Sequence, residues 1–538
     1  MDVEPLLRGA SSTSDYGTND GKRNGGSRNA ADEDDEATTV VTPARWYLTG
    51  CQIAVLVLAV LAIVLSVAML AGGYKAILIN ALHEQLVIKK GSKAYDMCKA
   101  TPVPLSLKLY VFNLTNPEEF KNVSKPVLDE LGPYVWREYH KKQNVTFHPN
   151  DTVTYLQQRW WVWDQHASGN RSQDDLIITL NTIPVAAAYG LRNSIPFQAF
   201  LDLGLKSVGE QLTVSTTARK LVFDGVKDPL LDWVQKNVVN KKGKYHILYP
   251  FFEGTAVAEF EKFAWFFKRN LSLTYDGEFN MMTGEDTLDN LGRIDNWNGR
   301  NSTSFYTPPC NEVTGSAGEL FSPHLSRKDL IFFSSDLCMS AKLFFKEEVN
   351  DYGGLTTYRY WGTNHTFANG TTVPGNECYC VGKTCAPMGL LNAESCRMGA
   401  PAFVSFPHFY AADPFLLNGV EGLAPDEKKH SLFLDVVPNL GVPADVSIKL
   451  QINIHVTPFP SISLLERVPD VYLPMLWFEV QGGMTPSIAS QMKMLVYFMN
   501  SSVPSVVVWS VIICLAVLAM VVVLLVAWRR NSSYDLVT

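Results

Sequence analysis

The sequence predicts a strand-rich domain held between two apolar helices, and three observations lead to this fold class. Two stretches without charged residues lie near the ends of the 538-residue chain, from Trp46 to Tyr74 and from Val503 to Trp528. Between them, segments of alternating polar and apolar residues recur, as in strands that bury one face. The region between the two stretches, residues 73–503, is large for one core, which favours a barrel with insertions.

The chain begins with a tail, residues 1–45, that is rich in Ser, Gly, Asn and Asp. This composition predicts a disordered segment. The apolar stretch that follows is longer than the ~20 residues a membrane-spanning helix needs, and too long for the apolar part of a signal peptide. We expect a transmembrane helix over residues 46–72. Cys51, at its cytosolic end, is either palmitoylated or a plain apolar residue of the span.

The large domain, residues 73–503, carries further helix and strand signals. Residues 75–90 are expected to continue from the first span as a helix. Residues 185–208 have apolar residues at helical spacing, and they predict two or three short helices, with Pro184 at a helix start and Pro196 at a break. Strands are predicted at residues 153–163, 330–333, 403–406 and 451–456.

A second transmembrane helix is expected over residues 504–528, followed by Arg529-Arg530 and a short tail, residues 529–538. The arginine pair places this tail in the cytosol, so both tails lie on that side and the large domain is lumenal or extracellular. Nine glycosylation acceptors of the form Asn-x-Ser/Thr support this orientation. They are Asn113, Asn122, Asn144, Asn150, Asn170, Asn270, Asn301, Asn364 and Asn369.

Six of the nine cysteines fall between residues 310 and 396, in a domain that we expect to be oxidised. They predict three disulfides, for which spacing alone leaves 15 pairings open. The alternative is a zinc site, although the spacing lacks the paired C-x2-C units of common zinc modules. The six are Cys310, Cys338, Cys378, Cys380, Cys385 and Cys396.

Charge and missing motifs exclude other classes of function. The net charge is −7 and no basic segment is present, so we expect no nucleic-acid partner. An enzyme would need catalytic motifs, yet the chain has no Gly-rich phosphate loop and no G-x-S-x-G, and His83-Glu84 lacks the second histidine of H-E-x-x-H. A channel would need polar pore-lining residues, and the second apolar stretch offers few. We expect no catalytic residue, no cofactor and no metal.

Several motifs in order along the large domain resemble the class B scavenger receptor family, which includes fatty acid translocases, lipoprotein receptors and lysosomal integral membrane proteins. They are FNLTNPEEF (112–120), LGPYVWRE (131–138), LVFDGVKDPLL (221–231) and GAPAFVSFPHFYAAD (399–413). The resemblance implies an antiparallel β-barrel with short helices, a helical bundle at the apex over about residues 185–215, and an apolar tunnel.

Particular residues take roles from this resemblance. It implies the disulfides Cys310–Cys378, Cys338–Cys396 and Cys380–Cys385, and leaves Cys98 as a buried free thiol. Lys206 falls near the lysine that lipid ligands approach in fatty acid translocases; the alternative is an ordinary solvated lysine. The lysosomal relatives use an apical histidine to hold a hydrolase, whereas this chain has Ser194-Ile195-Pro196 there, which argues against that role.

The tails contain two sorting patterns. Asp2 with Leu6-Leu7 fits an acidic dileucine signal, and Tyr534 with Val537 fits a Tyr-x-x-apolar signal. They predict clathrin adaptors as partners and a lysosomal or late endosomal membrane, with the plasma membrane as the alternative.

The expected function is a scavenger-type lipid receptor that takes up fatty acids, sterols or phospholipids and passes them through the tunnel to or from the membrane; lipoproteins are expected as further partners. The alternative is a lysosomal sorting receptor or a structural glycoprotein that binds a lumenal protein. Homo-oligomerisation is left open.

Overall fold

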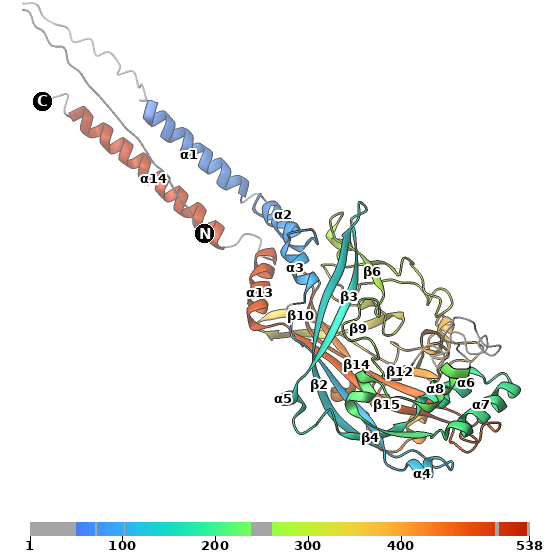
Figure 1. The fold of residues 1–538 in the computed structure, drawn as a ribbon. Coiled ribbons are helices and arrows are strands. Elements are labelled where there is room, and N and C mark those ends of the chain that lie inside the picture. The colour runs from blue at the N-terminus through green and yellow to red at the C-terminus, as the bar shows by residue number, and fades with distance from the viewer. Residues whose placement is uncertain are drawn as a thin grey trace, which may run out of the picture. The chain divides into compact units, whose positions relative to one another are not determined.

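One extended antiparallel sheet forms the framework of the large domain (Figure 1). The computed structural model describes residues 50–69, 73–101, 103–237, 261–382, 384–500 and 505–534. The chain divides into two units, residues 63–517 and residues 1–62 with 518–538. Within the described residues, the sheet has 13 strands in the order β7-β6-β3-β2-β1-β15-β14-β13-β10-β9-β8, with β12 paired to β14 and β11 paired to β12. Strands β4 and β5 form a separate ribbon.

The strands range from two-residue pairs to long, bent ribbons. They are β1 (Leu105–Leu114), β2 (Leu128–Phe147), β3 (Thr152–Trp163), β4 (Leu176–Leu180), β5 (Thr213–Thr217), β6 (Glu278–Met282), β7 (Ile294–Trp297), β8 (Asp329–Ser334), β9 (Met339–Tyr352), β10 (Leu355–Trp361), β11 (Leu391–Asn392), β12 (Ala402–Ser405), β13 (Phe433–Val437), β14 (Val442–Val456) and β15 (Val471–Gly483). The predicted strands at residues 153–163, 330–333 and 451–456 are confirmed as parts of β3, β8 and β14, and the one at residues 403–406 is confirmed as part of β12 up to Ser405.

The central strands bury both faces. In β1, Leu109 and Val111 pack into one apolar core, whereas Phe112 and Leu114, which point the other way, pack into a second. Strand β15 divides its side chains between the same two cores. Apolar burial on both sides of the sheet therefore fixes the register of these strands, because a slip of one residue would exchange the two faces.

A short segment, residues 315–317, joins the two ends of the sheet. The amide of Ile294, in β7, donates to the carbonyl of Gly315 at 2.8 Å, and the amide of Phe333, in β8, donates to the carbonyl of Ser316 at 2.8 Å. Gly315 has a φ of +85°, and a Cβ there would lie 2.3 Å from the carbonyl oxygen of Ile331, so only glycine fits. The edges β7 and β8 are thus linked, and the sheet is nearly closed into a barrel.

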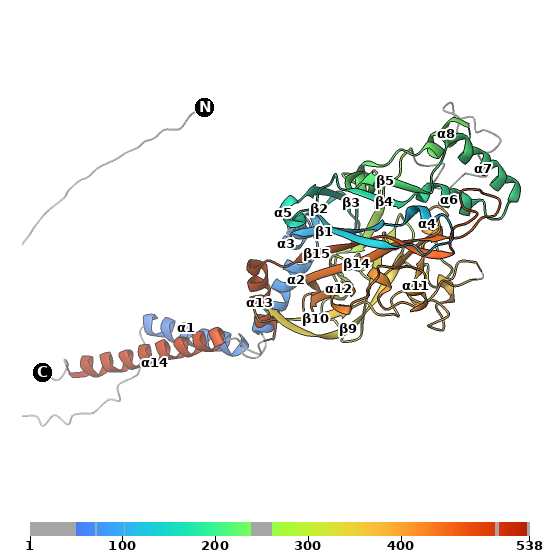
Figure 2. The same cartoon turned by 90° about the horizontal axis from the view of Figure 1, so that it is seen from below.

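Three helices gather at one end of the barrel, away from α2 (Tyr74–Leu86) and α13 (Pro486–Asn500) (Figures 1 and 2). We call α6 (Thr182–Gly190), α7 (Ile195–Val208) and α8 (Pro229–Asn237) the apical helices. The first two confirm the short helices predicted over residues 185–208.

The boundaries of two predicted helices need correction. Helix α6 starts before Pro184, because the Asn181 side chain accepts a hydrogen bond from the amide of Ile183 and caps the helix at Thr182. The helix expected over residues 75–90 ends at Leu86, since Val87 is extended.

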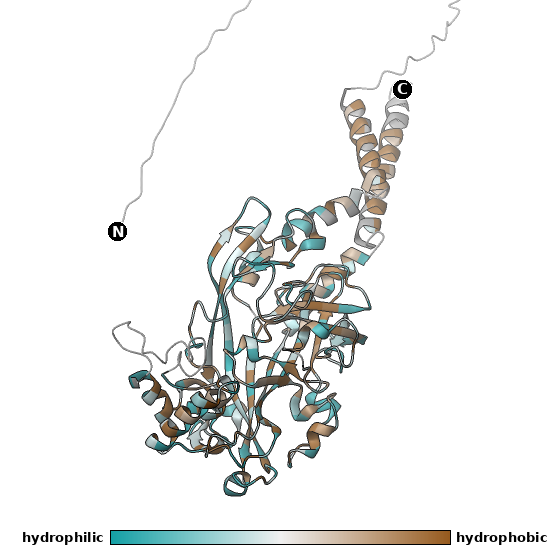
Figure 3. Ribbon diagram, turned by 90° about the vertical axis from the view of Figure 1, so that its right-hand side faces the viewer, coloured by the Kyte–Doolittle hydropathy of each residue, from teal (hydrophilic) through white to brown (hydrophobic). Residues whose placement is uncertain are grey.

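The remaining helices lie near the chain ends or in connections. Figure 3 shows apolar residues along most of α1 and α14. Within the described ranges, no helix meets both the length and the apolarity needed to cross a membrane. The remaining α-helices are α1 (Gly50–Ala68), α3 (Lys93–Lys99), α4 (Pro117–Phe120), α5 (Gln165–Ser168), α11 (Phe415–Asn418), α12 (Glu427–His430) and α14 (Ser505–Tyr534).

Candidate ligand-binding site

A pocket of about 240 Å³ lies at the base of the apical helices, and we call it the apical pocket. Its walls come from the end of β4, the start of α6, the turn after α7, the start of β5 and residues 226–229, which lead into α8. Phe263 and Trp265 form another wall. The pocket thus lies where one end of the β4–β5 ribbon meets the starts of two helices.

Asn181, Glu210 and Asp228 form a hydrogen-bonded trio in the pocket wall. The Asn181 Nδ2 atom donates to Glu210 Oε1 at 2.9 Å and to Asp228 Oδ2 at 2.8 Å, so the two carboxyl groups lie side by side. Asp228 Oδ1 accepts from the amides of Leu230 and Leu231 at the start of α8. All three trio residues are buried, and each holds a helix start or a turn in place.

Two buried carboxyl groups this close favour a protonated state. Burial, together with the charge of Asp228, raises the pKa of Glu210 to about 7. Burial also raises the pKa of Asp228 above its ordinary value. The pocket wall therefore holds on to a proton at a pH where an exposed carboxyl group would have lost it.

Two further polar atoms of the pocket wall are buried without a hydrogen-bond partner in the described part of the chain: Thr182 Oγ1 and Trp265 Nε1. Thr182 is 6% exposed. The Trp265 ring meets Phe263 edge to face, with centroids 5.1 Å apart. The pocket thus combines two acids, two unsatisfied polar atoms and an aromatic corner.

Lys206, which the sequence marked as a ligand contact, lies on α7 and is not part of the wall of this pocket. Its side chain is 59% exposed and pairs with Asp202 at 2.6 Å, one helical turn away. The arrangement is that of a solvated surface pair, which contributes little to stability. A role for Lys206 in ligand binding stays a prediction.

A second polar region crosses the interior of the barrel, and we call it the ionic belt. On β2, buried Glu138 and Lys142 alternate with exposed Arg137 and Lys141, so the charged pair points inward. The belt consists of Glu138, His140, Lys142, Arg159, Arg269, Asp276, Glu319 and Asp336.

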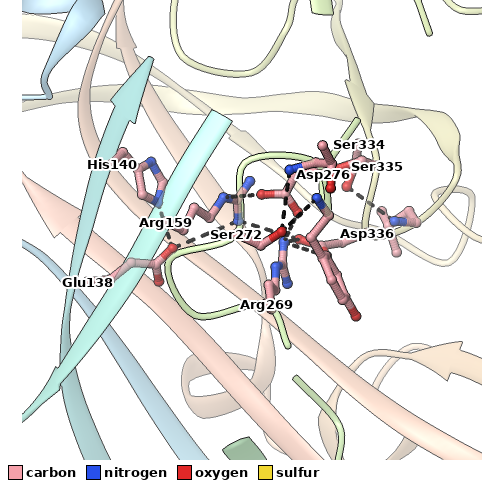
Figure 4. A network of polar contacts seen from close by, with 12 residues as sticks. Glu138, His140, Arg159, Arg269, Ser272, Asp276, Ser334, Ser335 and Asp336 are labelled. Atoms are coloured by element: carbon pink, nitrogen blue, oxygen red, sulfur yellow. Dashed lines mark hydrogen bonds and ion pairs between the residues drawn. The ribbon is translucent and has the colours of Figure 1, made fainter. Parts of the chain in front are cut away.

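The arginines of the belt share their carboxylates (Figure 4). Arg269 pairs with Asp276 at 2.7 Å and with Asp336 at 2.9 Å, and Arg159 Nε lies 3.0 Å from Asp276. Each buried charge thus has an opposite charge within reach, which is the condition under which buried ions are tolerated.

The belt divides the apolar interior. Along the inward face of β3, Tyr155 belongs to one apolar core, Arg159 belongs to the belt and Trp161 belongs to another core. An apolar ligand that moved along the barrel would therefore meet charged side chains between two apolar regions.

Three disulfides join the cysteines between residues 310 and 396, in the pairs that the family resemblance implies. Cys310 is bonded to Cys378, and Cys338 to Cys396. The third bond, Cys380–Cys385, closes a short loop. Cys98 is a free thiol, as expected, but it is only half-buried.

The predicted glycosylation acceptors differ in exposure. Asn369 is 2% exposed, and its Nδ2 atom, where a glycan would be attached, donates to the carbonyl of Ala386 at 2.6 Å. Asn113 and Asn364 are half-buried. The exposed acceptors are Asn122, Asn144, Asn150, Asn170, Asn270 and Asn301.

The sorting patterns fall outside this description. Asp2, Leu6, Leu7 and Val537 lie outside the described residues, and Tyr534 is the last residue of α14. These patterns stay predictions.

Sequence reasoning did not single out the trio or Thr182. One signal was available: Asp228 precedes Pro229 in LVFDGVKDPLL, and an acidic residue before a proline is typical of a helix start. The pairing with Glu210 depends on the fold, because 17 intervening residues include the whole of β5.

Comparison with known proteins shows which family this chain resembles in sequence. A sequence profile of the CD36 family matches residues 55–526. Scavenger receptor class B member 1 of Cricetulus griseus is 33% identical over 444 residues, which cover 82% of this chain and 82% of the relative. Protein peste of Drosophila melanogaster is 32% identical over 418 residues, or 76% of this chain and 72% of the relative. Lysosome membrane protein 2 of Mus musculus is 29% identical over 418 residues, or 77% of this chain and 82% of the relative.

The nearly closed antiparallel barrel, the helices at one end of it and the three disulfides agree with the class of protein that the motifs implied, the class B scavenger receptors. The chain belongs to the CD36 family, as its motifs implied.

Proposed function

We propose that this protein is a membrane-anchored lipid receptor of the scavenger type, rather than an enzyme. It takes up fatty acids, sterols or phospholipids at the apical helices and passes them along a tunnel in the barrel to or from the membrane. Two transmembrane helices, over residues 46–72 and 504–528, anchor the lumenal or extracellular domain, residues 73–503. The absence of charge from both stretches supports this anchoring.

The observation that carries the proposal is the apical pocket, at the helix-capped end of a nearly closed barrel. Side chains such as Leu180, Ile183 and Val226 give the pocket apolar walls. Transfer through an apolar enclosure is favourable because each methylene group kept from water saves ~0.8 kcal/mol. The ionic belt requires the route to pass beside the charged residues or to widen where the belt crosses the barrel.

The experiment compares two tryptophan substitutions on the β4–β5 ribbon. Val214 lines the apical pocket, whereas Leu176 is 71% exposed. We expect Val214→Trp to fill the pocket and to abolish most transfer of a fluorescent phospholipid or sterol into liposomes that contain the full-length protein. Leu176→Trp, the matched control, should transfer lipid like the unmodified protein.

Lipids extracted from the purified full-length protein should be identified by mass spectrometry at the same time. If no lipid co-purifies, and if Val214→Trp transfers lipid as fast as Leu176→Trp, the proposed uptake route is wrong.

A further inference from the structure

We propose that the apical pocket binds an amphiphile through a head group that carries an ammonium nitrogen beside an oxygen acceptor. The inference deepens the proposed lipid-receptor function, on which it rests, by naming the chemical class that this pocket prefers. It depends on the acids of the wall, on its unsatisfied polar atoms and on its aromatic corner.

Within the described ranges, no basic side chain is hydrogen-bonded to the acids of the pocket. The carboxyl groups of Glu210 and Asp228 accept hydrogen bonds from the Asn181 side chain and from the backbone amides of Gln211, Leu230 and Leu231, and they are also hydrogen-bonded to each other. Amide dipoles stabilise negative charge but do not neutralise it. A positive group in the pocket would supply the missing charge at short range, in a site largely screened from water.

Two buried polar atoms in the pocket wall, on Thr182 and Trp265, provide independent evidence for a ligand. Thr182 Oγ1 can accept or donate a hydrogen bond, Trp265 Nε1 can only donate one, and both are buried without a partner in the described ranges. A buried polar group without a partner is unfavourable because it has lost its hydrogen bonds to water, so such groups are rare in native proteins unless a ligand or water satisfies them. An ammonium N–H can donate to Thr182, and an adjacent oxygen can accept from Trp265.

The aromatic corner suits the same head group. The rings of Phe263 and Trp265 meet at 77°. The faces of aromatic rings attract cations, and tryptophan does so most strongly. A volume of about 240 Å³ is below the range of pockets that enclose a drug-sized ligand, so the apical pocket suits a head group rather than a whole lipid.

A free carboxylate is a poor ligand for the same wall, because it would be a third acid beside Glu210 and Asp228. Lys227 lies at the pocket and is exposed, where it can meet a phosphate that follows the ammonium group, as in a zwitterionic lipid head. Free amines without an apolar tail carry the same ammonium group, and the experiment distinguishes such amines from amphiphiles.

Binding is measured by calorimetry on the full-length protein in an uncharged maltoside detergent. The probes are octylammonium, octanoate of the same chain length, and ethanolamine, which has the head group without the tail. We expect octylammonium to bind at least about tenfold more tightly than octanoate, which corresponds to one charge-assisted contact. Ethanolamine should bind more weakly than octylammonium; equal binding would overturn the assignment to an amphiphile.

Matched variants assign the binding to this pocket. Glu210→Gln with Asp228→Asn removes both charges and keeps one acceptor oxygen on each side chain, and it should weaken the binding of octylammonium by about tenfold to a hundredfold. Asp224→Asn removes one exposed charge nearby, outside the pocket, and should leave the affinity unchanged. Octylammonium affinity that is the same in all three proteins would overturn the proposal and indicate that water alone fills the pocket.

Thr182→Val provides a second variant if the double substitution does not fold. It removes the unpaired hydroxyl with little change in shape, so the melting temperature should not fall, whereas octylammonium should bind more weakly. Unchanged affinity in this variant would contradict the role of Thr182. If octanoate binds more tightly than octylammonium, this inference fails while the lipid-receptor function stands.

Discussion

At the scale of single residues, Asn181 organises the apical pocket. Its Oδ1 atom accepts from the amide of Ile183 and caps α6, while its Nδ2 atom donates to both Glu210 and Asp228. Asp228 in turn caps α8 through the amides of Leu230 and Leu231. Substitution of Asn181 would therefore remove the cap of α6 and leave two neighbouring carboxyl groups without their shared donor.

The stability of the apical helices should depend on pH through Glu210. Its pKa in the folded protein is raised from 4.5 to about 7, so the folded state binds a proton more tightly than the unfolded chain does. This contribution to stability is fully present below pH 4.5 and is lost as the pH rises through 7. The neighbouring titratable groups at the pocket are Asp228 and Lys227.

We expect hydrogen exchange of the α8 amides, corrected for intrinsic rates, to show more protection at pH 5.5 than at pH 8. Glu210→Gln should remove most of this difference, because its side chain does not titrate. Protection that does not change with pH in the unmodified protein would show that protonation of Glu210 does not stabilise the apical helices between pH 5.5 and pH 8.

Burial also predicts which glycosylation acceptors carry sugar. Asn369 is buried, and its Nδ2 atom is bonded to the Ala386 carbonyl, so a glycan on that nitrogen is incompatible with this fold. Site-resolved mass spectrometry after enzymatic deglycosylation should find Asn170 occupied and Asn369 unmodified. As a control, Asn170→Gln should shift the gel mobility of the protein and Asn369→Gln should not. A glycan on Asn369 in the folded, secreted-pathway protein would contradict the local structure of residues 366–372.

At the scale of elements, the sequence predicts strands and helices from their local periodic patterns. It does not predict the contacts that form only when the sheet closes into a barrel. The alternating pattern of residues 451–456 and the apolar spacing of residues 185–208 were sufficient to place β14 and the apical helices. The link at Gly315 could not be predicted, because two hydrogen bonds to strands distant in sequence define it. The ionic belt was missed for a similar reason: Glu138 and Lys142 alternate as surface residues would, and only the closed barrel buries them.

Removal of one charged partner from the ionic belt should destabilise the domain. Lys142 is buried and pairs with Glu319. Burial opposes ionisation of Glu319, but the charges of Lys142 and His140 outweigh it and hold the pKa of Glu319 far below its ordinary value. Since this pKa is depressed, the contribution to stability is present at neutral pH and at pH 5, and it is lost only at strongly acidic pH.

We expect Lys142→Met to destabilise the domain by roughly 1–3 kcal/mol, since it leaves the Glu319 carboxylate, whose side chain is 33% exposed, beside fewer positive charges. The double variant Lys142→Met with Glu319→Gln should recover a large part of this loss. Urea unfolding of the purified protein at pH 7 and pH 5 measures both effects. A single variant that is as stable as the unmodified protein would show that the belt is hydrated and that the pair contributes little.

At the scale of the whole molecule, family membership and architecture agree. The CD36-family match covers residues 55–526, which include the barrel, the apical helices and the disulfide-linked region. The relatives include both a scavenger receptor and a lysosome membrane protein, so membership alone does not choose between two membranes. We predict that the tails make this choice, through two short patterns that we expect adaptor proteins to bind as extended peptides.

The last prediction is that the protein resides mainly in late endosomal or lysosomal membrane and that the N-terminal dileucine directs it there. Leu6 and Leu7 follow Asp2 at the spacing of an acidic dileucine signal, and Tyr534 begins a second pattern near the other end. The acid-stabilised apex and the belt that stays paired at pH 5 suit an acidic compartment. Leu6→Ala with Leu7→Ala should therefore raise the biotinylated fraction at the cell surface several-fold, and Tyr534→Ala alone should raise it less. Asp15→Ala, in the same tail but outside the signal, is the control. An unmodified protein found chiefly at the plasma membrane at steady state would show that neither signal is used.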